Sequence, residues 1–181
     1  IHPMRPQDQG FQEALVHRGG GIGQPADPPG NLYLNPTLQH NGVVESTSGY
    51  CSDVFTNAAI AFMEKHRSQP FFVYLAFNCP HAPLQVQERD LELYRKLDLR
   101  HGAFPAFGHP MSGDGQPDVT RNIYGMVTNI DTNLLRLFSR LTDLKLEENT
   151  IVVFLTDNGP QQPRYNSGMR NRKGSVYEGD E

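Results

Sequence analysis

The amino-acid sequence predicts an α/β fold, in which a mostly parallel sheet is flanked by helices. Two continuous apolar runs, FFVYLAF at residues 71–77 and IVVFL at residues 151–155, lack the alternation of a half-exposed strand. Such runs are typical of strands buried on both faces. A segment with helical periodicity precedes each run, so the order is helix, strand, loop, helix, strand, loop. This alternation is typical of right-handed parallel crossover units.

Three helices are expected. In the first, residues 52–66, apolar side chains recur at helical spacing and Ser52 or Asp53 is the expected N-cap. A shorter helix is expected at residues 88–96. The clearest helix covers residues 119–141, with Asp118 as its expected N-cap. Its apolar stripe, typical of core packing, consists of Ile123, Met126, Val127, Ile130, Leu134, Leu137, Phe138 and Leu141.

The remaining segments are rich in Gly and Pro. A strand is expected at residues 11–17, followed by the glycine run of residues 19–23. We interpret this run as a turn-rich loop, with a phosphate cradle as the alternative, because it lacks the Lys-Ser/Thr of a P-loop. Residues 100–117 form a long loop, which is either a functional rim or an insertion.

Composition excludes several classes of function. The 181 residues suit one domain, and the net charge of −4 provides no basic field for nucleic acid or anionic lipid. No apolar run approaches the roughly 20 residues of a membrane-spanning helix. The two cysteines, Cys51 and Cys79, have no metal-ligand spacing, and we expect both to be buried free thiols.

Polar residues follow both predicted buried strands, at Asn78–His81 and at Asp157–Asn158. Ligands bind beyond the carboxyl ends of strands in such sheets, so the two clusters are expected to share one site. Asp157 and Asn158 offer oxygen donors suited to a divalent cation, although Asp-Asn-Gly-Pro is also good turn chemistry. His81 is either a proton donor or an exposed loop histidine. Lys173 is either an oxyanion ligand or part of a solvated charged turn.

The combination of motifs is more specific than any one of them. TDNGP followed by RKGSVYEG closely resembles the sulfatase family, in particular bacterial arylsulfatase-like members of the alkaline-phosphatase superfamily. The earlier CPHAP resembles the histidine loop of that family. PMRPQDQGFQEALVHRGGGIGQ resembles the segment that follows the family's first Lys and His pair. The resemblance runs from Met4 to Gly179.

The resemblance implies a role for each matching residue. Asp157 and Asn158 match two metal ligands, for Ca²⁺ most often and Mg²⁺ as the alternative. His81 matches the histidine near the leaving-group oxygen of the sulfate ester, and Lys173 matches the lysine that binds the sulfate oxygens. The implied parent is a sulfuric ester hydrolase that acts on a sulfated carbohydrate or an aryl sulfate. The family also implies a periplasmic or secreted location, and no nucleic-acid or membrane partner is expected.

The sequence also departs from the family pattern. No C/S-x-P-x-R motif, the source of the formylglycine nucleophile, occurs in the chain, and the family's early Asp-Asp metal pair is absent. We therefore expect residues 1–181 to be a fragment of a catalytic domain, inactive alone and lacking the nucleophile region and the C-terminal part. Two alternatives stay open at this point: a phosphonate or phosphate ester hydrolase of the same superfamily, and a non-catalytic relative that binds sulfated glycans.

Overall fold

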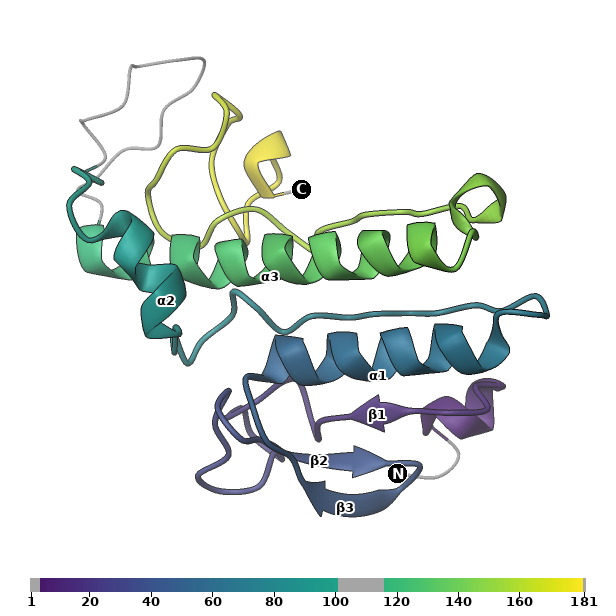
Figure 1. Ribbon diagram of the computed structural model, residues 1–181. Coiled ribbons are helices and arrows are strands. Elements are labelled where there is room, and N and C mark those ends of the chain that lie inside the picture. Colours follow the sequence, from purple (N-terminus) through teal and green to yellow (C-terminus); the bar gives the residue numbers. More distant parts are fainter. Residues whose placement is uncertain (1–3, 101–115, 181) are drawn as a thin grey trace.

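Three short strands form an antiparallel sheet at one side of the molecule (Figure 1). The computed structural model describes residues 4–100 and 116–180. Strand β1 (Leu15–Val16) lies within the expected segment 11–17 and pairs with β2 (Thr37–His40), which pairs with β3 (Val43–Ser46). The β2–β3 hairpin was not predicted. Its two-residue turn, Asn41-Gly42, has positive φ at both positions, which is the sequence signal for a tight hairpin.

Helix α1 (Cys51–His66) confirms the predicted helix and its end before Pro70. The predicted N-cap is wrong, because Tyr50 occupies that position. Ser52 and Asp53 lie in the first turn of the helix, and their side chains bond elsewhere. The Ser52 hydroxyl donates to the Cys79 sulfur, and the Asp53 carboxylate accepts from amides of the last long helix.

Helix α2 (Glu88–Leu91) continues into a 3-10 turn (Glu92–Tyr94), which confirms the short helix predicted there. Helix α3 (Pro117–Asp143) confirms the long helix, but its N-cap is Gln116 rather than Asp118 because Pro117 takes the first helical position. Further 3-10 turns are Pro6–Gln9, Glu147–Asn149 and Glu178–Asp180. No helix in the described ranges is long and apolar enough to cross a membrane.

The buried face of α3 differs from the predicted stripe. Ile123, Met126 and Leu141 are buried, as predicted, whereas Val127 and Phe138 are exposed. Asn129 and Asn133 are fully buried instead, because their amides bond to Asp53 of α1. The buried face of α3 therefore combines part of the predicted apolar stripe with two asparagines whose burial is offset by hydrogen bonds.

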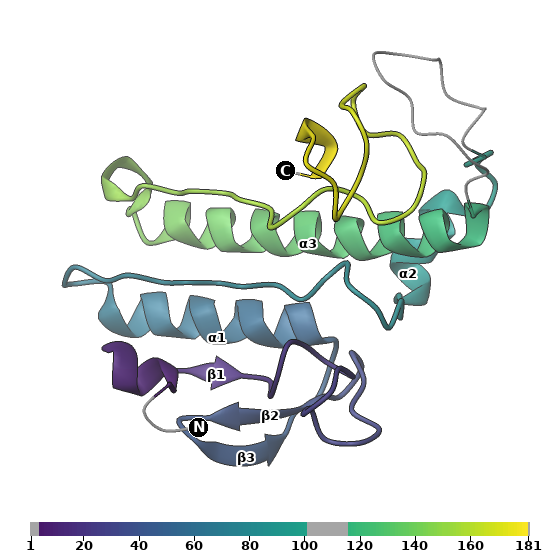
Figure 2. The ribbon, with the colours of Figure 1, turned by 180° about the vertical axis from the view of Figure 1, so that it is seen from behind.

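The two predicted buried strands are not strands in this structure. Residues 71–77 and 151–155 are extended and unpaired, and Phe72, Tyr74 and Ile151 are 73%, 74% and 93% exposed. A strand needs a hydrogen-bonded neighbour, and within residues 4–100 and 116–180 no segment pairs with either run. In Figures 1 and 2 each run lies along the helix that precedes it and runs opposite to that helix. The two runs point in the same direction as each other, so their carboxyl ends lie on the same side of the molecule.

The core joins the segment around β2 to α1, α3 and the loop after residues 71–77. Cys51 and Cys79 are buried free thiols, as predicted. The buried cluster consists of Ile22, Tyr33, Leu38, Tyr50, Cys51, Phe55, Cys79 and Met126. This arrangement fixes the position of the loop that carries His81.

Candidate active site

His81 lies in an exposed loop that begins where the extended segment 71–77 ends. Its backbone N–H donates to the Asn78 carbonyl at 2.9 Å, and its ring Nδ1 lies 2.9 Å from the Ala82 carbonyl oxygen. A carbonyl oxygen only accepts, so Nδ1 carries a hydrogen in this contact. The other ring nitrogen, Nε2, is therefore the atom that can act on a substrate.

Asp157 and Asn158 follow the second extended segment as two adjacent oxygen donors. Asp157 is exposed, and Asn158 is half-buried with its Nδ2 donating to the Gly159 carbonyl at 3.0 Å. This bond orients the amide so that Oδ1 is left for another ligand. Two such oxygens fit a hard divalent cation. The described residues contain no group of three or more His, Cys, Asp or Glu that could hold a metal, so these two supply only part of a coordination sphere.

The turn that carries Lys173 is linked by backbone hydrogen bonds to the residues that follow Asn158. The Lys173 N–H donates to the Pro160 carbonyl at 3.0 Å, and the Gly159 N–H donates to the Asp180 carbonyl at 2.6 Å. The Asp180 carboxylate also accepts from the Gly174 N–H at 2.7 Å. The end of the extended segment that carries Asp157 and the turn that carries Lys173 are therefore joined by backbone hydrogen bonds.

The intervening loop is held by residues that the sequence analysis did not single out. Asn166 is buried, and its Nδ2 donates to the carbonyls of Met169 (2.6 Å) and Asn171 (3.2 Å). Arg164 is also buried and donates to Gln162 Oε1, and burial lowers its pKa. An Asn in a Gly-rich loop is the signal for such a turn, but its partners are set by the loop path.

His81 is not bonded to the other three predicted site residues. No hydrogen bond or ion pair in the described part of the chain joins it to Asp157, Asn158 or Lys173. The relation between them is topological, because both loops follow extended segments that run in the same direction (Figures 1 and 2). The sharing of one site by all four residues stays a prediction.

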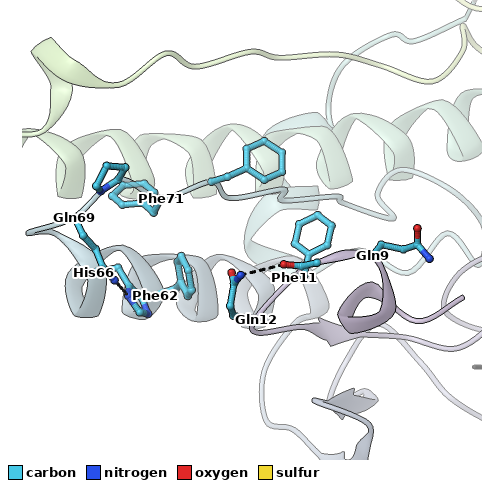
Figure 3. Close-up of a pocket in the computed structure, with 10 residues that line it drawn as sticks. Gln9, Phe11, Gln12, Phe62, His66, Gln69 and Phe71 are labelled. Atoms are coloured by element: carbon cyan, nitrogen blue, oxygen red, sulfur yellow. Dashed lines mark hydrogen bonds between the residues drawn. The ribbon is translucent and has the colours of Figure 1, made fainter. Parts of the chain in front are cut away.

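A groove at the start of the 71–77 segment contains none of these residues (Figure 3). Its walls are aromatic: Phe11 lies 6.0 Å from Phe72 between ring centroids, and Phe62 meets Phe71 edge-on at 6.4 Å. It lies beyond the opposite end of the segment from His81. The groove is therefore separate from the candidate site.

Comparison with known proteins places these motifs in a family. The sulfatase family model matches residues 3–180. The chain is 29% identical to the uncharacterized sulfatase YdeN of Escherichia coli, over 86% of this chain and 24% of that protein. It is 30% identical to a sulfatase of Formosa agariphila, over 85% of this chain and 28% of that protein. The chain thus spans about a quarter of the length of these relatives.

The solved structures confirm the predicted α/β fold class. The crystal structure of Ps i-CgsB in complex with k-i-k-neocarrahexaose is similar over 99% of this chain and 40% of that chain, with a TM-score of 0.79 and 24% sequence identity. The family match and this structural likeness agree along nearly the whole chain. The chain belongs to the sulfatase family.

Proposed function

We propose that this chain forms part of the active site of an enzyme that hydrolyses sulfate esters. The observation that carries the proposal is the backbone link between the segment that carries Asp157 and Asn158 and the Lys173 turn. This link holds two oxygen donors for a cation and one ammonium group on segments bonded to each other. A sulfate ester is a monoanion whose oxygens gain negative charge during transfer. The Lys173 ammonium, and a cation held by Asp157 and Asn158, would place positive charge near those oxygens.

Lys173 and His81 have different roles in this proposal. The exposed Lys173 ammonium binds sulfate oxygens as a point charge. His81 in its protonated form keeps Nδ1–H on the Ala82 carbonyl and presents Nε2–H to the leaving group. As the sulfur–oxygen bond breaks, the Nε2 proton passes to the leaving oxygen, which departs as a neutral hydroxyl.

The metal and the nucleophile complete the proposal. The Asp157 carboxylate and the side-chain Oδ1 of Asn158 would hold Ca²⁺, with Mg²⁺ as the alternative. The cation when bound supplies positive charge near the sulfate oxygens. Because no C/S-x-P-x-R motif occurs in this chain, we propose that a formylglycine nucleophile comes from residues outside 1–181. The chain's own residues then bind and protonate rather than attack.

We propose a sulfated carbohydrate as the substrate. Support comes from the similar fold of Ps i-CgsB, whose structure was solved with k-i-k-neocarrahexaose bound. The exposed position of His81 also leaves room for a large leaving group. An aryl sulfate such as p-nitrophenyl sulfate serves as a chromogenic probe of the same bond cleavage.

The test is sulfate release by the longer polypeptide that carries this chain, with p-nitrophenyl sulfate and sulfated oligosaccharides as substrates. Lys173→Ala is expected to lower kcat/KM by roughly 100-fold or more, the range found when one transition-state donor is removed. Arg172→Ala is the matched control, since it removes an exposed cation one residue away, and should stay within about threefold of wild type. Equal losses in both variants, or faster hydrolysis of p-nitrophenyl phosphate, would contradict the proposal.

Metal dependence is tested in the same assay. Removal of divalent cations by a chelator should abolish turnover, and Ca²⁺ or Mg²⁺ should restore it. Asp157→Ala should lower the affinity for the cation that restores turnover by at least about tenfold, because a carboxylate ligand is lost. Full activity in the chelated protein would rule out the metal part of the proposal.

A further inference from the structure

We infer that Tyr33 and Tyr50 are positioning residues for His81, holding its loop through their buried hydroxyl groups. The inference rests on the proposed function for the role of His81 as a proton donor. The placement of the loop by the two tyrosines stands on geometry alone. Neither tyrosine touches the substrate in this proposal, so each acts through the loop.

The two tyrosines form one rigid unit beneath the loop. Their rings are stacked with centroids 5.7 Å apart and planes inclined by 24°. Tyr33 is 1% exposed and Tyr50 is 3% exposed, so neither side chain has freedom to swing. Tyr50 is the residue before α1, and its position is therefore set by the helix start.

Both hydroxyls bond to main-chain carbonyls of the His81 loop. The Tyr33 hydroxyl donates to the carbonyl of His81 itself at 3.0 Å, and the Tyr50 hydroxyl donates to the Gln85 carbonyl at 2.6 Å. In return, Gln85 Oε1 accepts from the Tyr33 N–H at 2.7 Å. Tyr33, which is 48 positions before His81, and Tyr50, which is 35 positions before Gln85, thus fix the two ends of the segment 81–85.

The carbonyl between these ends also has a fixed partner. The Ala82 oxygen accepts from Gln24 Nε2 at 3.0 Å and contacts His81 Nδ1 at 2.9 Å. The imidazole is oriented by this oxygen, which belongs to the peptide between Ala82 and Pro83. The Tyr33 bond to the His81 carbonyl restrains the preceding peptide, between His81 and Ala82. Together the two contacts hold both peptides that follow His81, and so they limit where Nε2 points.

A purely structural role does not account for the choice of tyrosine. Phenylalanine would fill the same core without the cost of burying a hydroxyl. Burial raises the pKa of both Tyr33 and Tyr50, so the two hydroxyls stay protonated and act as donors. Both donors are directed at one short loop, the loop that carries the predicted proton donor.

The experiment uses Tyr33→Phe and Tyr50→Phe in the longer polypeptide, which remove only the hydroxyls and keep the stacked rings. The control is Tyr94→Phe, which removes a hydroxyl bonded at 2.6 Å to Thr128, away from the loop. Proton donation matters most for a poor leaving group. For a sulfated sugar, kcat should therefore fall about tenfold with KM unchanged, which is part of the roughly 10²- to 10⁴-fold that general acid catalysis contributes. For p-nitrophenyl sulfate, whose phenolate leaves without a proton, the loss should stay below about threefold.

Hydrogen exchange of residues 79–86 provides a second measurement that needs no turnover. In both loop variants these amides should exchange about tenfold faster than in wild type, with no change in Tyr94→Phe. If the loop variants match the control in exchange and in leaving-group dependence, the inference is wrong. If the wild-type protein hydrolyses no sulfate ester, the proposed function fails, and exchange alone then decides whether the tyrosines hold the loop.

Discussion

Gly159 and Gly179 lie backbone against backbone where the two halves of the candidate site meet. A Cβ atom on Gly159 would stand 1.8 Å from the Gly179 carbonyl oxygen, and one on Gly179 would stand 2.2 Å from the Asn171 carbonyl oxygen. Contacts this short involve main-chain atoms, which have no flexible end to move aside. Any side chain at either position must therefore separate the segment that carries Asp157 from the Lys173 turn.

Gly159→Ala should accordingly weaken cation binding without touching a ligand. We expect Ca²⁺ affinity of the longer protein to fall about 10- to 100-fold, as when a residue supporting a metal ligand is changed. Gly20→Ala is the matched control, because a Cβ there meets nothing within 4 Å. Calorimetric titration measures both variants. Unchanged affinity in Gly159→Ala would show that the two halves of the site do not depend on this contact.

At the scale of secondary-structure elements, the carboxylate of Asp53 on α1 joins the three helices. Its Oδ1 accepts from Asn129 (3.0 Å) and Asn133 (2.7 Å) of α3, and its Oδ2 accepts from Arg89 (3.1 Å) of α2. Burial alone raises the pKa of Asp53, but the amide donors and the Arg89 guanidinium outweigh it and leave the pKa below its usual value. The ionised carboxylate thus stabilises the folded state.

Asp90 on α2 behaves in the opposite way. It is buried, and its Oδ2 has no hydrogen-bond partner among the residues described. Burial raises its pKa, and the nearby Arg89 guanidinium only partly opposes this. An ionised Asp90 therefore costs free energy in the folded state.

These two aspartates predict opposite pH dependences. Asp53→Asn should lower the free energy of unfolding by ~1.5–3 kcal/mol at pH 7, the range for hydrogen bonds to a charged group. Because the pKa of Asp53 is lower in the folded state than in the unfolded state, this contribution is present above about pH 4 and is lost as pH falls further.

Asp90→Asn should raise the free energy of unfolding at pH 7, and the gain should vanish as the unfolded carboxyl protonates near pH 4.

Urea unfolding at several pH values measures both effects. Asp131→Asn, which removes an exposed carboxylate from α3, is the control for a change in net charge alone. If all three variants shift the free energy of unfolding by the same amount at every pH, the electrostatic account of the helix junction is wrong.

At the scale of the whole molecule, the two extended segments expose apolar surface that the fold does not cover. Ile151, Val153 and Leu155 are 93%, 71% and 81% exposed, and no strand pairs with them in the described residues. Unpaired apolar edges of this kind readily add a neighbouring strand. The relatives are longer than this chain, which spans 24% of the Escherichia coli sulfatase and 28% of the Formosa agariphila sulfatase.

We therefore predict that residues 151–155 gain strand partners in the longer polypeptide proposed above to contain this chain. Their amides should exchange with solvent at least about 100-fold more slowly there than in isolated residues 1–181. Hydrogen exchange followed by mass spectrometry compares the two samples. Amides of α1, which are bonded within the helix in both, are the internal standard. Equal exchange of residues 151–155 in both samples would show that no strand covers this edge.

Local patterns in the sequence were enough for the helices and the site motifs. Helical periodicity and Pro70 placed α1, and an apolar stripe placed α3, although the predicted N-cap of α3, Asp118, was wrong. CPHAP, TDNGP and RKGSVYEG identified the family because each motif is contiguous in the chain. These features depend on neighbours within a few residues, so they can be read without the fold.

Only the tertiary structure decided the contacts between distant segments. It showed that Asn133 bonds to α1 while Phe138 is exposed, and that Tyr33 reaches the His81 carbonyl 48 residues away. It also showed that residues 71–77 and 151–155 have no strand partner within residues 4–100 and 116–180. The physical reason is that a buried polar group is stable only where its partner lies, and a strand exists only where another strand accepts its hydrogen bonds. Neither partner is encoded in the local pattern around the residue that needs it.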